Sequence, residues 1–251
     1  SGEVLSTTSD YAAAFIVMAL FQAKFYLLFS FLFGYSAHYI IKSDKKNRSR
    51  WIARSIGLML FGALHFSLLF HGDILFVYGL FGLLLLALYF RKEKTLKVWA
   101  WVIYIISTVL LFLASAATYA GELFLTSKGK AIPEIFRIGS LDEALSSGSF
   151  IENIPARIEL WLAAAPQGLI LQGPFVFVAF LIGVLVARRN GLSQAGVSKQ
   201  LMIKLAKWGI LIGLPLQLLA AYVFVSNEVS ENYSASIYLL AISINLSLIH
   251  I

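Results

Sequence analysis

Two histidines and an aspartate lie close together in LHFSLLFHGDILFVYG, residues 64–79, between two apolar runs. His65 falls inside the first run, and Asp73 follows at a short polar break. An imidazole can accept and return a proton near neutral pH, as a general base must. A carboxylate can orient that imidazole. We therefore predict His65 as a general base and Asp73 as a second catalytic residue.

Both residues also have a structural interpretation. An ionisable side chain inside a membrane span costs at least about 2.5 kcal/mol unless it meets water or a partner, so His65 could be a neutral group hydrogen-bonded to a neighbouring helix. Asp73 precedes an apolar helix and is suited to cap its N-terminus. The sequence leaves these alternatives open.

Four further side chains are candidates for substrate binding: Lys24, His71, Tyr78 and Gln172. Lys24 could bind an anionic ligand or extend to the membrane interface. His71 is expected in the headgroup region, and Tyr78 within a span, where most tyrosines pack with a satisfied hydroxyl. Gln172 precedes a Gly-Pro pair that predicts a local helix break.

Several kinds of chemistry are not indicated. The chain contains no GxxxxGK[ST] phosphate loop, no GxSxG nucleophile elbow and no HExxH zinc helix. It has no cysteine, and therefore no thiol nucleophile or thiolate ligand. The spacing of His65, His71 and Asp73 matches no metal pattern, so no metal site is predicted. No permanently bound cofactor is predicted either.

Apolar segments must position these residues. The chain of 251 residues is 59% hydrophobic and only 13% charged, more than a soluble domain of this size buries. Spanning about 30 Å of hydrocarbon takes roughly 20 apolar residues. A seventh stretch begins near Ser236, and six others are residues 24–41, 56–70, 74–90, 98–119, 169–187 and 208–224. We expect an all-α, polytopic transmembrane bundle of six to seven spans, forming a single domain over residues 1–251.

Basic residues predict the orientation. Residues 42–54, 91–97 and 188–207 contain fifteen of the twenty lysines and arginines. Such alternate basic loops are typically cytoplasmic, which places Asp73 and the connection 120–168 on the extracytoplasmic side. The net charge of +7 favours anionic lipid headgroups. The expected partner is the lipid bilayer and not nucleic acid, because aromatic residues that could stack on bases are not interspersed among the basic residues. The oligomeric state is not predicted.

The connection 120–168 contains IENIPARIELWLAAAP. Its apolar residues, including Ile154, Ile158 and Trp161, recur at helical spacing and predict an amphipathic helix on the outer membrane surface. All five tryptophans fall near predicted interfaces, as in an anchoring belt: Trp51, Trp99, Trp101, Trp161 and Trp208.

Four motifs resemble, in order, the YeiB-like family of bacterial multi-pass membrane proteins: KFYLLFSFLFGYSA from Lys24, ARSIGLMLFGALH from Ala53, GDILFVYGLFG from Gly72 and FLIGVLVARRNGL from Phe180. That family is largely a domain of unknown function. The resemblance implies the bacterial cytoplasmic (inner) membrane and a distant relationship to membrane acyltransferases, including those that acetylate sugars across a bilayer. The family's opening helix, with an acidic residue followed by Arg-Gly, is missing, so we expect a fragment without its first span. The final LSLIHI matches a translated transposon end, so residues 246–251 carry no functional weight.

Two function classes follow. The first, which the resemblance implies, is an acyltransferase that accepts an activated acyl group through the membrane from a donor whose identity is left open. It transfers this group to an extracytoplasmic small molecule or envelope glycan, with His65 as general base and a polar tunnel leading to His65. The alternative is a transporter or exporter of a small amphipathic molecule, with a central cavity lined by Gln172, Pro174, Pro215 and Gln217. A non-catalytic membrane scaffold is a third interpretation.

Overall fold

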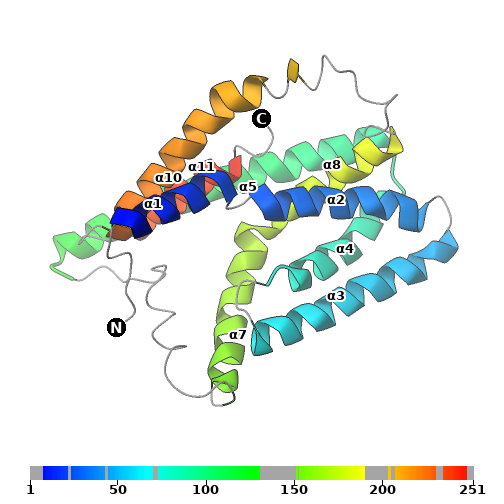
Figure 1. Cartoon of the computed structure of the whole chain (residues 1–251), viewed down its shortest axis with the longest axis horizontal. Helices are drawn as coiled ribbons and strands as arrows, with labels where there is room; N and C mark the ends of the chain where they lie inside the picture. Colours follow the sequence, from blue (N-terminus) through cyan, green and yellow to red (C-terminus); the bar gives the residue numbers. More distant parts are fainter. Residues whose placement is uncertain are drawn as a thin grey trace. The chain divides into compact units, whose positions relative to one another are not determined.

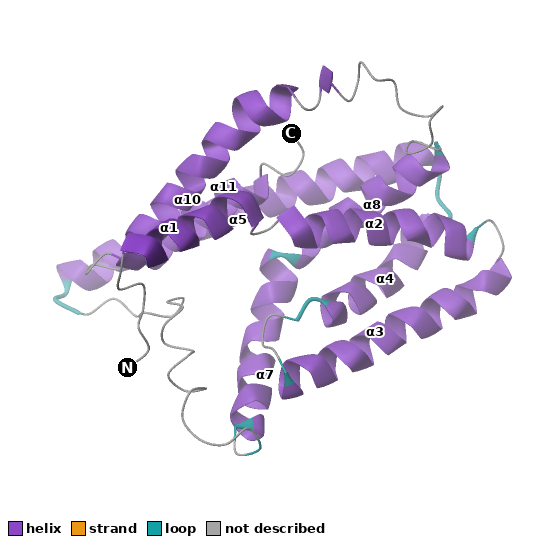
Figure 2. Cartoon of the chain, in the orientation of Figure 1, coloured by secondary structure: helices purple, strands orange, loops and turns teal. Residues whose placement is uncertain are grey.

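The computed structural model describes residues 8–21, 24–42, 45–69, 73–130, 151, 153–189, 203–204, 207–229 and 234–247. Every regular element within these ranges is a helix, and Figure 2 accordingly draws no strand in the described part of the chain. The predicted all-α class is confirmed.

Four stretches of the described chain are long and apolar enough to cross a membrane: Thr8–Ile41, Arg48–Leu68, Glu93–Ser127 and Gly209–Asn227. This is fewer than the six to seven spans that we expected. Three further apolar helices lie at expected positions but are shorter: Leu75–Tyr89, Gly173–Arg188 and Ala235–Leu246. The first of them has 15 residues. At 1.5 Å per residue it extends about 22 Å, less than a typical hydrocarbon core.

The chain groups into two compact units. The hairpin unit contains Phe25–Ser107 and Gly148–Lys199, and the terminal unit contains Ser1–Lys24, Thr108–Ser147 and Gln200–Ile251. Helix α5 (Glu93–Ser127) contributes its first part to the hairpin unit and its second part to the terminal unit. It extends beyond the predicted end at residue 119. The single transmembrane domain stays a prediction. Within the connection between residues 120 and 168, residues 131–150 and 152 lie outside the described residues.

Within the described residues, the hairpin unit contains the start of α5, the short helix η2 (Lys45–Asn47) and five α-helices. These are α2 (Lys24–Ile41), α3 (Arg48–Leu68), α4 (Leu75–Tyr89), α7 (Ile154–Leu171) and α8 (Gly173–Arg188). Helices α3 and α4 lie side by side, as the short connection between them requires (Figure 1). The predicted span 169–187 is instead divided at Gln172 between α7 and α8, because the Gly-Pro pair that follows begins a new helix.

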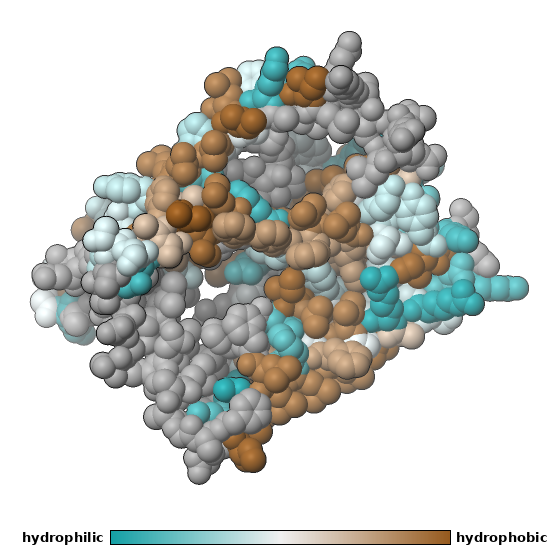
Figure 3. All heavy atoms as spheres, viewed as in Figure 1, coloured by the Kyte–Doolittle hydropathy of each residue, from teal (hydrophilic) through white to brown (hydrophobic). Residues whose placement is uncertain are grey.

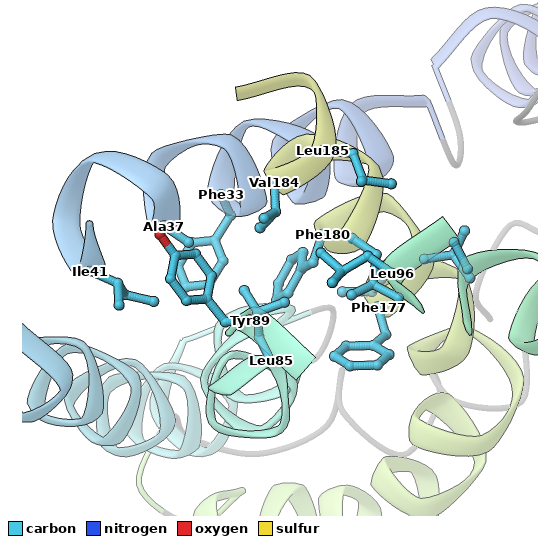
Figure 4. Packing of buried hydrophobic residues seen from close by; sticks show 14 of the residues in the cluster. Phe33, Ala37, Ile41, Leu85, Tyr89, Leu96, Phe177, Phe180, Val184 and Leu185 are labelled. Atoms are coloured by element: carbon cyan, nitrogen blue, oxygen red, sulfur yellow. The ribbon is translucent and has the colours of Figure 1, made fainter. Parts of the chain in front are cut away.

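Small residues bring α2 and α8 into backbone contact. A Cβ atom on Gly34 would collide with the backbone of Phe180, and one on Gly183 with the backbone of Phe31 and Tyr35. The ring centroids of Phe33 and Phe180 are 4.8 Å apart, in a core to which α4 adds Leu85 (Figure 4). This close packing fixes the helices around the candidate site.

The terminal unit is built from α1 (Thr8–Ile16), η1 (Val17–Phe21), η3 (Gly209–Gly213), α10 (Leu214–Val229), α11 (Ala235–Ser247) and the end of α5. Its core contains Met18, Ala221 and Phe224. Glu122 of α5 is buried and accepts hydrogen bonds from the backbone nitrogen and the hydroxyl of Ser236, at 3.0 and 2.6 Å. These bonds satisfy the N-terminus of α11.

Apolar side chains cover much of the exposed surface of α3, where Phe61 is 70% and Leu60 63% exposed. In Figure 3, hydrophobic residues cover the described surface along this helix, whereas hydrophilic residues gather at the end where α2 leads to α3. A large apolar surface of this kind suits contact with lipid and not with water. The helices and their surface are consistent with a membrane protein.

Candidate functional site

The structure brings the two predicted catalytic residues together. His65 lies in the last turn of α3, and Asp73 lies just before α4. Nδ1 of His65 is 2.8 Å from Oδ2 of Asp73. The Asp73 side chain is only 2% exposed, whereas the His65 side chain is 39% exposed. The carboxylate is therefore enclosed while part of the imidazole remains accessible.

The second oxygen of Asp73 caps α4. Its Oδ1 atom accepts hydrogen bonds from the backbone nitrogens of Leu75 and Phe76, at 2.7 and 3.2 Å. The N-terminus of a helix stabilises a negative charge. Asp73 thus serves as a helix cap and as the partner of His65, so the two interpretations of this residue are compatible.

This arrangement has a chemical consequence for His65. A carboxylate beside Nδ1 favours the proton on that nitrogen, which leaves Nε2 as the atom that can accept a proton. The carboxylate is itself fixed by its hydrogen bonds to the first turn of α4. An imidazole beside a carboxylate is a suitable general base.

Gly62 permits the close approach of α3 to the start of α4. A Cβ atom at this position would lie 2.8 Å from Oδ1 of Asp73 and would collide with the backbone of Phe76. Gly62 lies one turn before His65, on the same side of the helix. Sequence reasoning did not identify this glycine, since nothing in an apolar run distinguishes a packing glycine from any other.

A cavity of about 210 Å³ adjoins the pair. Its walls include Asp73, Phe76 and Val77 from the α4 side, and Trp161 and Gln172 from α7 and its C-terminal end. The predicted residues Asp73 and Gln172 therefore share one cavity. Gln172 is exposed and stands between α7 and α8.

Tyr78 is buried at a helix contact. Its hydroxyl donates to the backbone carbonyl of Tyr26, and Ser30 Oγ lies 2.9 Å from the same hydroxyl as a donor. The hydroxyl thus joins α4 to α2 and is occupied by protein partners. Tyr78 is not among the residues that line the cavity, so its role in substrate binding stays a prediction.

The structure does not test whether Lys24 and His71 lie near the pair. Lys24 belongs to the terminal unit, where its Nζ donates to the carbonyl of Ala19 at 2.5 Å. This bond satisfies a carbonyl of η1. His71 lies outside the described residues. The binding roles of both residues stay predictions.

Helix α7 contributes residues whose roles the sequence did not reveal. Trp161 contacts Phe76 edge to face, with ring centroids 5.1 Å apart, and it lines the cavity instead of serving only as an interface anchor. Arg157 Nη1 donates to the carbonyl of Leu68 at 3.0 Å, which ties α7 to the end of α3. The assignment of Trp51 to an anchoring belt was wrong, because this residue is fully buried and donates to the carbonyl of Gly82 at 2.7 Å.

The fold defines an all-α protein with helices long and apolar enough to cross a membrane. No family model matches the chain. It is similar to the uncharacterized protein YxaH of Bacillus subtilis (strain 168), with 28% identity over 218 residues, 84% of this chain and 54% of that protein. The chain thus spans about half the length of this relative. No solved structure matches, so a functional proposal must rest on the site.

Proposed function

We propose that the chain is part of a multi-pass protein of the bacterial cytoplasmic membrane that transfers an acyl group to an acceptor on the extracytoplasmic side. Three basic loops alternate with apolar segments, which supports six to seven spans and this orientation. The short helices α4, α8 and α11 can cross where the bilayer thins locally. Membership of the YeiB-like family is part of the same proposal.

One observation carries the catalytic part: Nδ1 of His65 lies 2.8 Å from the enclosed carboxylate of Asp73. A carboxylate that is fixed by a helix N-terminus holds the imidazole ready for proton transfer at Nε2. A histidine in this setting fits the function of a general base better than that of a packing residue, because 39% of its side chain stays exposed.

The proposed reaction begins with the acceptor and uses His65 as the proton carrier. The hydroxyl or amine of the acceptor attacks the carbonyl carbon of an ester or thioester donor, while its proton passes to Nε2 of His65. The bond between acceptor and acyl carbon forms, and the bond from that carbon to the donor's oxygen or sulfur breaks. His65 then returns the proton to the departing alkoxide or thiolate, so the imidazole ends neutral.

The test compares the envelope lipids, glycans and small molecules of a strain that lacks the gene with those of a strain in which the gene is restored. Acyl transfer predicts an acylated component that disappears on deletion and returns on restoration. Identical profiles in both strains, for all three classes of molecule, would overturn the proposal.

A transporter of a small amphipathic molecule is the second candidate, and the cavity at Gln172 is the observation that favours it. Gln217, which was expected to line the same central cavity, is buried in the terminal unit, and its amide donates to the carbonyl of Met18 at 3.4 Å. Transport predicts a metabolite that accumulates unchanged inside the deletion strain, so the same experiment separates the two candidates.

A further inference from the structure

We propose that the cavity beside Asp73 binds a short, uncharged acyl group, and that the side-chain amide of Gln172 donates a hydrogen bond to the carbonyl oxygen of that group. The identification of the occupant as an acyl group rests on the proposed function. Its size, its lack of charge and its polar contact follow from the cavity itself.

The size of the cavity sets the size of the occupant. An apolar cavity of about 150 Å³ accommodates benzene. The cavity beside Asp73 measures about 210 Å³, and by the same proportion it holds roughly eight heavy atoms. A short acyl chain with its carbonyl group has this size, whereas a complete sugar with substituents or a long lipid chain does not.

The walls select an apolar occupant. Phe66, Phe76 and Trp161 form an aromatic side of the cavity, and the centroids of the Phe76 and Trp161 rings are 5.1 Å apart. Val77 and Val176 add aliphatic surface. Such a lining favours hydrocarbon, because apolar surface is transferred out of water or headgroups.

The charge of the wall excludes an anion. Among the lining residues, Asp73 is the one with an acidic side chain, and its two oxygens lie against His65 and the first turn of α4. A carboxylate ligand would meet this negative charge at close range, whereas an ester would not. Gln172 is exposed and lines the same space, so its NH₂ group can donate a hydrogen bond to an ester carbonyl.

The position of the cavity connects it to the catalytic pair. Asp73 is both a wall of the cavity and the partner of His65. An acyl group in the cavity would therefore lie beside Asp73 of the pair.

The test uses photolabelling in native membranes that contain the full-length protein. The probe is the methyl ester of a diazirine-bearing pentanoic acid, and the labelled peptides are mapped by mass spectrometry. We expect labels on the cavity wall at Phe76 and Trp161. Methyl pentanoate should compete for this site, whereas the pentanoate anion at the same concentration should not. Equal competition by the anion would overturn the inferred selectivity.

Two variants test the location. Gly168 lines the cavity, and a Cβ atom there meets no described atom within 4 Å, so Gly168→Leu should fill the space and abolish the wall labels. Gly57→Leu is the matched control, because Gly57 of α3 is equally open but is not a lining residue. Gln172→Leu should weaken the apparent affinity about twofold to tenfold, as expected for one lost hydrogen bond. The inference fails if the Gly168→Leu and Gly57→Leu proteins carry the same amount of label at Phe76 and Trp161. It also fails if the Gln172→Leu protein binds the ester probe with the affinity of the native protein.

This experiment separates the pocket from the proposed reaction, because labelling needs no turnover. Wall labels that persist in a His65→Gln variant support the pocket whether or not the reaction is acyl transfer. An acyl transfer that depends on His65 but proceeds without any wall label in the native protein would overturn the pocket alone.

Discussion

The carboxylate of Asp73 contacts Nδ1 of His65 at 2.8 Å with one oxygen and the first turn of α4 with the other. Rotation of this carboxylate away from the imidazole would also break the helix cap. The orientation of His65 is therefore coupled to the start of α4. The packing of α3 against α4, which Gly62 permits, maintains the pair.

The coupling leads to a prediction for Asp73→Asn. Asparagine keeps an oxygen that can cap α4, so the free energy of unfolding should fall by less than about 1 kcal/mol. The imidazole loses its negatively charged partner, and acyl transfer should fall, though less than in a His65 variant. Product formation and thermal unfolding of the same membrane preparation check both parts. Unchanged product formation would argue against an orienting role for Asp73.

A second prediction compares two tyrosines of one helix contact. Tyr78→Phe removes a hydroxyl with two protein partners and should reduce the free energy of unfolding by about 1–3 kcal/mol. Tyr26→Phe is the matched control, since the hydroxyl of Tyr26 is buried and has no hydrogen-bond partner among the described residues. Loss of the Tyr26 hydroxyl should therefore leave the free energy of unfolding nearly unchanged. Equal destabilisation by both changes, measured by thermal unfolding in detergent, would contradict these contacts.

The ends of several helices could be predicted from the sequence. The expected span 24–41 corresponds to α2, and the expected span 74–90 differs from α4 by one residue at each end. Polar or charged residues border both apolar runs, and such borders define helix ends without knowledge of the packing. The contact of His65 with Asp73 was also predictable, because a short connection keeps the two residues close.

The wall of the cavity could not be predicted in the same way. Trp161 and Gln172 are 88 and 99 residues away from Asp73 along the chain, and no periodicity shows which helices pack together. The division at Gln172 was visible as a Gly-Pro pair, yet apolar residues on both sides suggested one continuous span. The burial of Trp51 follows from its contacts with Phe33 and Gly82, which depend on the tertiary structure.

A third prediction tests the contact between α2 and α8. Gly183→Ala places a methyl group against the backbone of α2, where no flexible side chain can yield, and should destabilise the protein by about 1–3 kcal/mol. A Cβ atom at Gly57 meets no described atom within 4 Å. Gly57→Ala should therefore leave the free energy of unfolding unchanged or raise it by up to about 1 kcal/mol, because alanine has the higher helix propensity. Thermal unfolding of the two variants gives the comparison. A Gly183→Ala protein as stable as Gly57→Ala would contradict the close packing.

A fourth prediction concerns the orientation in the membrane. The chain has no cysteine, so single cysteines can be introduced directly. Ile151 is 75% exposed and lies in the connection proposed to be extracytoplasmic, whereas Lys92 is exposed in a basic loop. Ile151→Cys should react with a membrane-impermeant maleimide in intact cells, and Lys92→Cys only after permeabilisation. The reverse pattern would invert the orientation and place Asp73 on the cytoplasmic side.

The most direct test of the catalytic proposal is product formation by His65→Gln, introduced into the chromosomal gene and normalised to the amount of protein in the membrane. Leu64→Met, at an exposed apolar neighbour, is the control. Removal of a general base typically lowers a rate by about 10²- to 10⁴-fold. We predict a loss of this size in His65→Gln, at normal membrane abundance, and full activity in Leu64→Met. Native levels of acylated product in His65→Gln would contradict the assignment of His65 as the general base.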